Sequence, residues 1–187
     1  MNPFTTFYAA DRQKWRRWLS RHYRSASEIW LIYYKKASGK PRIAYNDAVE
    51  EALCFGWIDS TVKHLDDERY MQRFSPRKPK SPYSPANRER LKRLIRARKV
   101  RKDVLAKVGD LGAEEFRIAS DIVDSIKSSK RAWKHFQDFS DSYKRIRIGF
   151  IEGPRQRPAE FQKRLKYFIK MTDLNRQFGY GGIEKYY

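Results

Sequence analysis

Hydrophobic residues recur with a helical period near the start of the chain. In residues 11–22 they stand at Trp15, Trp18, Leu19 and His22, a spacing of i, i+3, i+4 and i+7. Asp11 precedes them, where the positive end of a helix dipole favours a carboxylate. The pattern predicts an amphipathic helix whose inward face includes His22 as a packed core side chain.

The next segment has the composition of a strand. Residues 29–36, IWLIYYKK, are β-branched and aromatic and lack polar alternation, which predicts a strand buried on both faces and therefore central in its sheet. The preceding Ser25–Glu28 has capping-box spacing, so we expect a single turn before the strand. Residues 37–41 read as a loop.

A second helix and a hairpin follow. Asn46 is a good N-cap for a helix over 47–55, with Cys54 buried inside it, and Gly56 suits the left-handed residue that ends such a helix. Residues 57–65 and 68–75 then predict a hairpin around the acidic turn LDDE. Pairing about that turn sets Asp59 opposite Phe74 and Val62 opposite Met71. Together with 29–36 this gives a three-stranded antiparallel sheet.

A Ser/Pro loop, residues 75–84, leads into a predicted helix over about 85–100. Ser84 is its N-cap and Pro85 fits the first helical position. Further helices follow in the last third, marked by apolar positions at helical spacing: Ala119, Ile122, Val123 and Ile126; Trp133, Phe136 and Phe139; Tyr143, Ile146, Phe150 and Ile151; Phe161, Leu165, Phe168 and Ile169.

These elements predict an α+β protein with a small three-stranded antiparallel sheet, covering helices and a mainly helical C-terminal module. We expect an α+β domain over 1–102, the helical module over 103–171 and an irregular tail over 172–187. The single cysteine excludes an intramolecular disulfide. No apolar run reaches the ~18 residues of a membrane span, and the N-terminus lacks signal-peptide character, so we expect a cytoplasmic protein.

The distribution of charged residues indicates possible binding partners, which the hydrophobic pattern does not. The chain has 42 Lys and Arg against 22 Asp and Glu, a net charge of +20. Residues 69–102 hold fourteen of these cations and one acid, Glu89, and so most of the net charge. Such a field concentrates anions, which indicates nucleic acid, phosphate-bearing metabolites or anionic lipid as partners. A bias of the source proteome toward basic residues is the alternative explanation.

The start of the 85–100 helix is the first candidate site, because free backbone N–H groups and a positive dipole end bind anions. Its residues are Arg77, Lys78, Ser81, Ser84 and Asn87. The serines and the asparagine supply hydrogen bonds, and the two cations supply charge for a phosphate, a nucleotide or a nucleic-acid backbone. The structural alternative is that Ser84 and Asn87 cap the helix while Arg77 pairs with Asp59 or another carboxylate.

The second candidate is the cationic stripe of that helix, which suits salt-dependent tracking of a nucleic-acid backbone. Its residues are Arg88, Lys92, Arg96 and Lys99. Charge runs are also common as solvated faces, and no zinc, helix-turn-helix or RRM motif accompanies this one.

Catalysis has less support. Asp59 with His64, or Cys54 with His64, are the only acid–base or nucleophile pairs to consider, and strand alternation sets Asp59 and His64 on opposite faces. Three histidines and one cysteine lack metal-ligand spacing, so we expect no metal and no cofactor. An enzyme acting on a phosphorylated small molecule therefore remains an alternative only.

Several blocks of the chain together resemble the YdeI/OmpD-associated (bacteriocin-protection) protein family. The blocks are SEIWLIYYKKASGK, YNDAVEEALCFGWIDS, the turn LDDE, RFSPRKPKSPYSPANRERLKRLI and AWKHFQDFS, within residues 11–152. After Ile151 the chain reads GPRQRPAEFQKRL, where the family usually carries Ala-Lys-Arg and Thr-Arg.

The resemblance implies a small α+β domain followed by a helical module. It also implies a link to protection against bacteriocins or cationic peptides and to envelope stress, with no reaction, cofactor or catalytic residue. Combined with the charge, it gives our expectation of a non-catalytic, anion-binding protein, with a nucleic-acid-binding module as the alternative.

Overall fold

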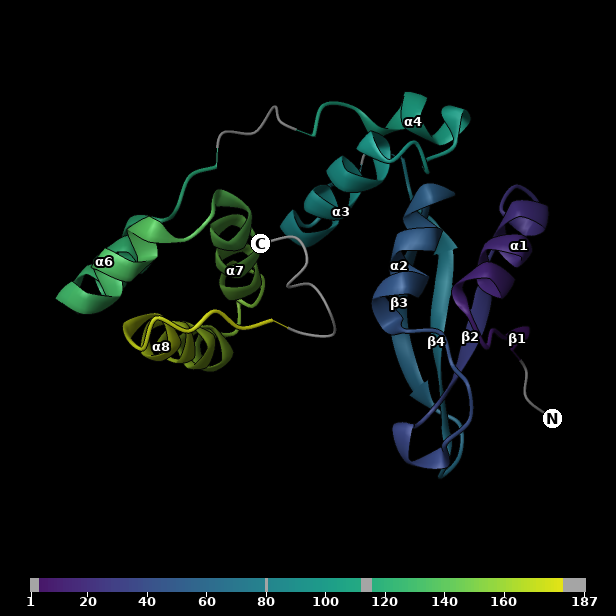
Figure 1. Ribbon diagram of the computed structural model, residues 1–187, viewed down its shortest axis with the longest axis horizontal. Coiled ribbons are helices and arrows are strands. Elements are labelled where there is room, and N and C mark those ends of the chain that lie inside the picture. Colours follow the sequence, from purple (N-terminus) through teal and green to yellow (C-terminus); the bar gives the residue numbers. More distant parts are fainter. Residues whose placement is uncertain (1–3, 80, 112–115, 180–187) are drawn as a thin grey trace. The chain divides into compact units, whose positions relative to one another are not determined.

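The computed structural model describes residues 4–79, 81–111 and 116–179 (Figure 1). The chain forms two compact units. Unit 1 comprises Met1–Pro82 and Arg90–Gly109, and unit 2 comprises Tyr83–Glu89 and Asp110–Tyr187. Each unit is described here by itself.

Unit 1 contains all the strands that the structure describes, with helices before, between and after them. In chain order its elements are β1 (Thr6–Tyr8), α1 (Arg12–His22), β2 (Ile29–Tyr34), the 3-10 turn η1 (Lys36–Ser38), α2 (Tyr45–Cys54), β3 (Trp57–His64), β4 (Arg69–Pro76), most of α3 (Pro85–Arg96) and α4 (Lys102–Val108). The sheet order is β1-β2-β4-β3. β2 is central, as its two-sided apolar sequence predicted.

The prediction of a three-stranded antiparallel sheet is wrong in part, because the sheet has a fourth strand and is mixed. β1 pairs in parallel with β2, and both other pairings are antiparallel. β1 is only three residues long, TFY, too short for a period-2 pattern to be read from the sequence.

The predicted hairpin forms, with a bulge that the sequence did not show. Asp59 stands opposite Phe74 as expected, but Val62 faces Gln72 rather than Met71, since the register shifts between Asp59 and Val62. A bulge adds one residue to one strand and reverses the alternation beyond it. As a result Asp59 and His64 pair with positions of β4 on the same face, and the prediction of opposite faces is wrong.

The core of unit 1 lies between the sheet and the pair α1 and α2 (Figure 1). Trp15 and Leu19 of α1 are fully buried, and the ring of Trp15 lies 5.3 Å from that of Phe74 in β4. Asp11 caps α1 by accepting a hydrogen bond from the backbone N–H of Lys14 at 2.7 Å. His22 is exposed and only flanks Trp18, so its expected place in the core is wrong.

α2 begins two residues earlier than its sequence suggested. Ala44 is the N-cap, and it provides no side-chain bond. The predicted cap, Asn46, instead lies inside the helix, where it is buried and its Oδ1 accepts a hydrogen bond from Arg90. Gly56 ends the element in the left-handed region, with φ of 73°, as predicted. The Ser25–Glu28 segment forms no helix, and Glu28 pairs with Arg73 at 2.7 Å.

Unit 2 is built from the first turn of α3 and from α5 (Ser120–Lys127), α6 (Lys130–Asp138), α7 (Asp141–Glu152) and α8 (Pro158–Asp173). Its core gathers the apolar positions read from the sequence, among them Ile122, Phe136, Tyr143 and Phe168. Ser129 and Ser140 cap α6 and α7. In the part of the chain that the structure describes, no helix is long and apolar enough to cross a membrane.

Candidate anion-binding surface

The loop between β4 and α3 is organised around Arg77. Its guanidinium Nη2 donates to the carbonyl oxygen of Ser81 at 2.8 Å, to Ser81 Oγ at 3.0 Å and to the carbonyl of Pro82 at 3.1 Å. Its backbone N–H donates to Gly56 at 2.9 Å, which ties the loop to the start of β3. These acceptors are neutral oxygens, and together the bonds order the loop around Arg77.

The beginning of α3 uses the predicted cap. Ser84 Oγ accepts a hydrogen bond from the backbone N–H of Asn87 at 3.3 Å, which satisfies one of the free N–H groups of the first turn. The side chain of Asn87 is buried. Arg88 Nε donates to the carbonyl of Tyr83 at 3.3 Å. The helix cap at Ser84, one part of the purely structural explanation of this loop, is therefore present.

The five residues of the first candidate site fall into two groups. Arg77, Lys78 and Ser81 belong to unit 1, and the structure brings Arg77 and Ser81 together; Ser84 and Asn87 belong to unit 2. Asp59, the suggested partner of Arg77, accepts instead from Tyr45 Oη at 2.9 Å and from Gln72 Nε2 at 2.8 Å.

The cationic stripe is shorter than the sequence suggested, because α3 ends at Arg96. Arg88, Lys92 and Arg96 lie on α3 at intervals of four residues, and Lys99 follows the helix. The chain turns at Arg98, which takes a left-handed φ of 54°. The carbonyl of Lys99 then accepts a hydrogen bond from Arg16 of α1 at 3.3 Å. Arg16, whose guanidinium also pairs with Glu51 at 2.5 Å, thus ties the segment after α3 to α1, a contact that no pattern in the sequence indicated.

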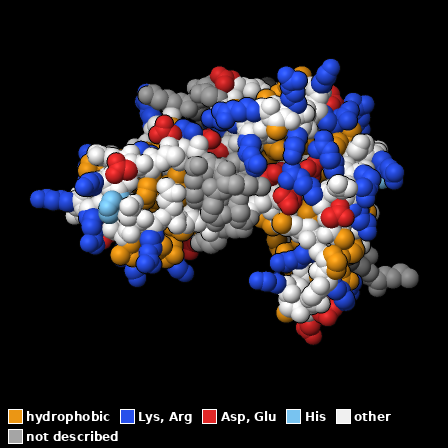
Figure 2. Space-filling model, viewed as in Figure 1, with side chains coloured by type: hydrophobic (Ala, Val, Ile, Leu, Met, Phe, Trp, Pro, Cys, Tyr) orange, Lys and Arg blue, Asp and Glu red, His pale blue; other side chains and the backbone are white. Residues whose placement is uncertain are grey.

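The cations of residues 69–102 differ in whether a carboxylate neutralises them. Arg69, Arg73 and Arg101 have ion-pair partners in Asp66, Glu28 and Asp103. A second set is exposed and has no carboxylate within ion-pair distance among the described residues: Lys78, Arg96, Arg98, Lys99 and Lys102. Figure 2 shows Lys and Arg side chains gathered where α3 ends and α4 begins. We call Arg96, Arg98, Lys99 and Lys102 the α3–α4 cationic cluster.

The residues considered for catalysis are not assembled into a site. Asp59 and His64 face positions of β4 that are four residues apart, about 13 Å along the strand. Cys54 is fully buried, and burial raises the pKa of its thiol to about 11. Within the described ranges, no group of three or more His, Cys, Asp or Glu side chains is placed to hold a metal ion.

The fold and the charge distribution define a two-unit protein, with an α+β part that carries a cationic surface and a helical part that follows it. Comparison with protein families agrees with that division. Residues 7–107, more than half of the chain, match a domain of unknown function, DUF8412, and the chain belongs to this family. Residues 115–175 form an OmdA domain, described as "Bacteriocin-protection, YdeI or OmpD-Associated". No curated protein and no solved structure matches the chain.

The family expected from the sequence is thus confirmed, but its extent differs. The expectation rested mainly on blocks before residue 96, and these fall within the DUF8412 match. The OmdA match instead covers the helical part, including the segment GPRQRPAEFQKRL that departs from the pattern we expected after Ile151.

Proposed function

We propose that this protein binds a phosphate-bearing anion without catalysis, and that this binding serves protection against bacteriocins or cationic peptides and the response to envelope stress. The description of the OmdA family supports the second part in its broad sense. The first part rests on the charge of residues 69–102.

The observation that carries the proposal is the set of exposed cations that lack a carboxylate partner among the described residues. Four of them form the α3–α4 cationic cluster, and Lys78 stands next to Arg77 in the loop. Unpaired cations at a surface keep their attraction for anions, whereas paired ones lose most of it.

We propose specific anion contacts at Arg77, Lys78 and Ser81 of unit 1, and further contacts at Ser84 and Asn87 of unit 2. The Arg77 bonds already order the loop, so a ligand would meet it with little loss of conformational entropy. Ser84 keeps oxygen lone pairs beyond the one that accepts from Asn87.

The test is a titration of the full chain with inorganic phosphate and with a nucleoside triphosphate. Replacing Arg77 and Ser84 by Ala together should weaken binding about tenfold, because one charge-assisted contact is worth roughly 1.5–3 kcal/mol. The matched control replaces Lys163 by Ala, an exposed cation of α8 in the other unit. If the double variant binds phosphate and the nucleoside triphosphate as tightly as the parent, the loop between β4 and α3 is not part of the binding site.

Nucleic acid is the second candidate ligand, through Arg88, Lys92, Arg96 and Lys99. It is favoured by Arg96 and Lys99, which are exposed without a carboxylate partner in the described ranges. Filter binding of single-stranded and duplex DNA at two salt concentrations would measure the number of phosphate contacts. Changing Arg96 and Lys99 to Gln should reduce the salt slope by roughly two. Binding that is absent or independent of salt rejects this candidate.

A further inference from the structure

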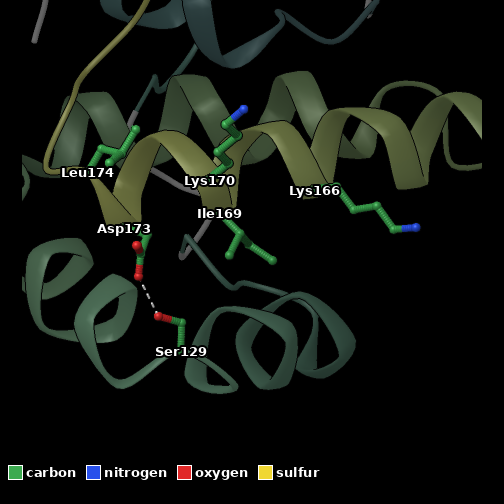
Figure 3. A pocket seen from close by; sticks show the side chains of 6 residues that line it. All are labelled: Ser129, Lys166, Ile169, Lys170, Asp173 and Leu174. Carbon is green, nitrogen blue, oxygen red and sulfur yellow. Dashed lines mark hydrogen bonds between the residues drawn. The ribbon is translucent and has the colours of Figure 1, made fainter.

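Unit 2 has an open pocket that belongs neither to the cationic surface nor to residues 69–102. It lies along α8 and reaches the start of α6, with a volume of about 370 Å³. Figure 3 shows Ile169 in its middle, Lys166 at one end, and Asp173 and Ser129 at the other; in that view Lys170 and Leu174 project from the upper edge of α8 and Ile169 from its lower edge. Its lining is mainly apolar. A volume of this size is in the range of small-molecule sites.

The acidic end of the pocket is already neutralised. Ser129 Oγ donates to Asp173 Oδ1 at 2.7 Å, and Arg131 donates to Asp173 Oδ2 from Nε at 3.0 Å and from Nη2. The contact with Arg131 holds the pKa of Asp173 below its usual range. Ser129 is also the N-cap of α6, accepting from the N–H of Ala132. Asp173 therefore occupies the anion position at this helix start, and a ligand has no role there.

The other two charges of the pocket have no such partner. Lys166 and Lys170 stand one turn apart on α8, both are exposed, and neither has a carboxylate within ion-pair distance among the described residues. Between Lys166 and Asp173 lies the apolar side chain of Ile169, and Leu174 at the end of the helix is 48% exposed. The pocket thus combines uncovered apolar surface with two positive charges that have no carboxylate partner in the described ranges.

We propose that this pocket binds a small amphipathic anion, an acyl carboxylate or an alkyl phosphate, with its apolar chain on Ile169 and Leu174 and its charged head at Lys166 and Lys170. From residue 166 to residue 174 the helix rises about 12 Å, enough for a short alkyl chain. Covering Leu174 and Ile169 removes apolar surface from water, which supplies affinity. The lysines select the sign of the head group, because a cationic amphiphile would meet two like charges.

This inference stands apart from the proposed function, since none of its residues lies in 69–102. The experiment titrates the full chain at low ionic strength with octyl phosphate and octanoate, and with octylammonium as the probe of opposite sign. We expect the two anions to bind and octylammonium to bind at least about tenfold more weakly, since two repulsive contacts replace two attractive ones.

Variants then locate the site. Lys166→Glu and Lys170→Glu should each weaken octyl phosphate binding about threefold to fivefold. Lys163→Glu, which makes the same charge change on an exposed position of α8 outside the pocket, should not. Leu174→Ser should weaken both anions and leave the binding of inorganic phosphate unchanged. Circular dichroism of each variant confirms that α8 remains folded.

Three results would overturn the inference. If octylammonium bound as tightly as the two anions, the pocket would be a hydrophobic surface that does not select for charge. If Lys163→Glu weakened octyl phosphate binding as much as Lys166→Glu and Lys170→Glu do, the net charge of the chain would explain the binding. Displacement of octyl phosphate by an acidic amphipathic peptide of much higher affinity would assign the pocket to a protein partner instead.

Discussion

The ring of Pro85, at the start of α3, lies against Gly149 of α7 so closely that a β-carbon at position 149 would collide with it. Glu89, one turn further along α3, accepts a hydrogen bond from Arg145 Nε at 2.8 Å and one from Ser142 Oγ at 3.0 Å. The first turn of α3 is thus fixed to α7 by one close packing contact and by one buried ion pair.

Gly149→Ala should destabilise the protein, although alanine favours helices. The gain in helix propensity is about 1 kcal/mol, and forcing a methyl group against a proline ring costs about 1–3 kcal/mol. We expect a net loss of stability in urea unfolding followed by circular dichroism. Gly153→Ala is the control, because its β-carbon would meet the nearest atom at 3.5 Å and the residue has a helical φ of −50°. Stability equal to the parent for Gly149→Ala would contradict the packing.

Arg12 neutralises three carboxylates of α2. It contacts Asp47 and Glu50 at 2.9 Å and Glu51 at 2.5 Å, and both glutamates are buried. Arg12→Met should cost about 3 kcal/mol, since removing one partner of a buried pair leaves a charge with reduced compensation. Arg17→Met, an exposed position on the same helix, should stay within about 0.5 kcal/mol of the parent. Thermal and urea unfolding measure both, and similar losses in the two variants would argue against the pairing.

Asp103 should contribute stability that depends on pH. Hydrogen bonds from Arg24 and then Tyr23 hold its pKa well below the usual range. Because the folded-state pKa is depressed, the stabilisation is fully present above the ordinary carboxyl pKa of about 3.9 and is lost as the pH falls toward the folded value. The difference in unfolding free energy between the parent and Asp103→Asn should therefore shrink below about pH 4. Asp67→Asn, at an exposed position without an ion pair in the described ranges, is the matched control.

Cys54 should report on unfolding. Its thiol is fully buried, and burial raises its pKa to about 11, so little reactive thiolate is present at neutral pH. Alkylation by iodoacetamide should be slow in the native protein and should accelerate through the urea transition. As the chain has one cysteine, mass spectrometry counts the product directly. Rapid, complete labelling without denaturant would contradict the burial.

Most of the fold could be predicted from local patterns. The strand Ile29–Tyr34, the hairpin, the left-handed Gly56 and the caps at Asp11 and Ser84 are where the sequence placed them. Each depends on residues within one element or one turn, which periodicity and capping chemistry can identify.

The misses depend on contacts between distant residues. The bulge between Asp59 and Val62 depends on the pairing of β3 with β4. It puts Asp59 and His64 on the same face of the sheet, whereas strict alternation predicted opposite faces. Asn46 has the residue type of an N-cap, but its side chain instead accepts a hydrogen bond from Arg90, which is 44 residues away in the chain. The charge density of residues 69–102 could be read from the sequence, whereas the pairing of individual cations with carboxylates depends on the fold, because partners such as Glu28 are distant in the chain.

Because Pro85 and Glu89 are grouped with unit 2, the segment 115–175 that matches the OmdA family is not the whole of the helical unit. A gene fragment that encoded only that segment would produce α7 with Arg145 deprived of Glu89 and with the surface at Gly149 uncovered. A protein that acquired only this segment during evolution would therefore need another element to pack on Gly149 and to pair with Arg145, as the first turn of α3 does here. Expression trials on truncated forms should keep residues 83–89 with the helical part or replace them.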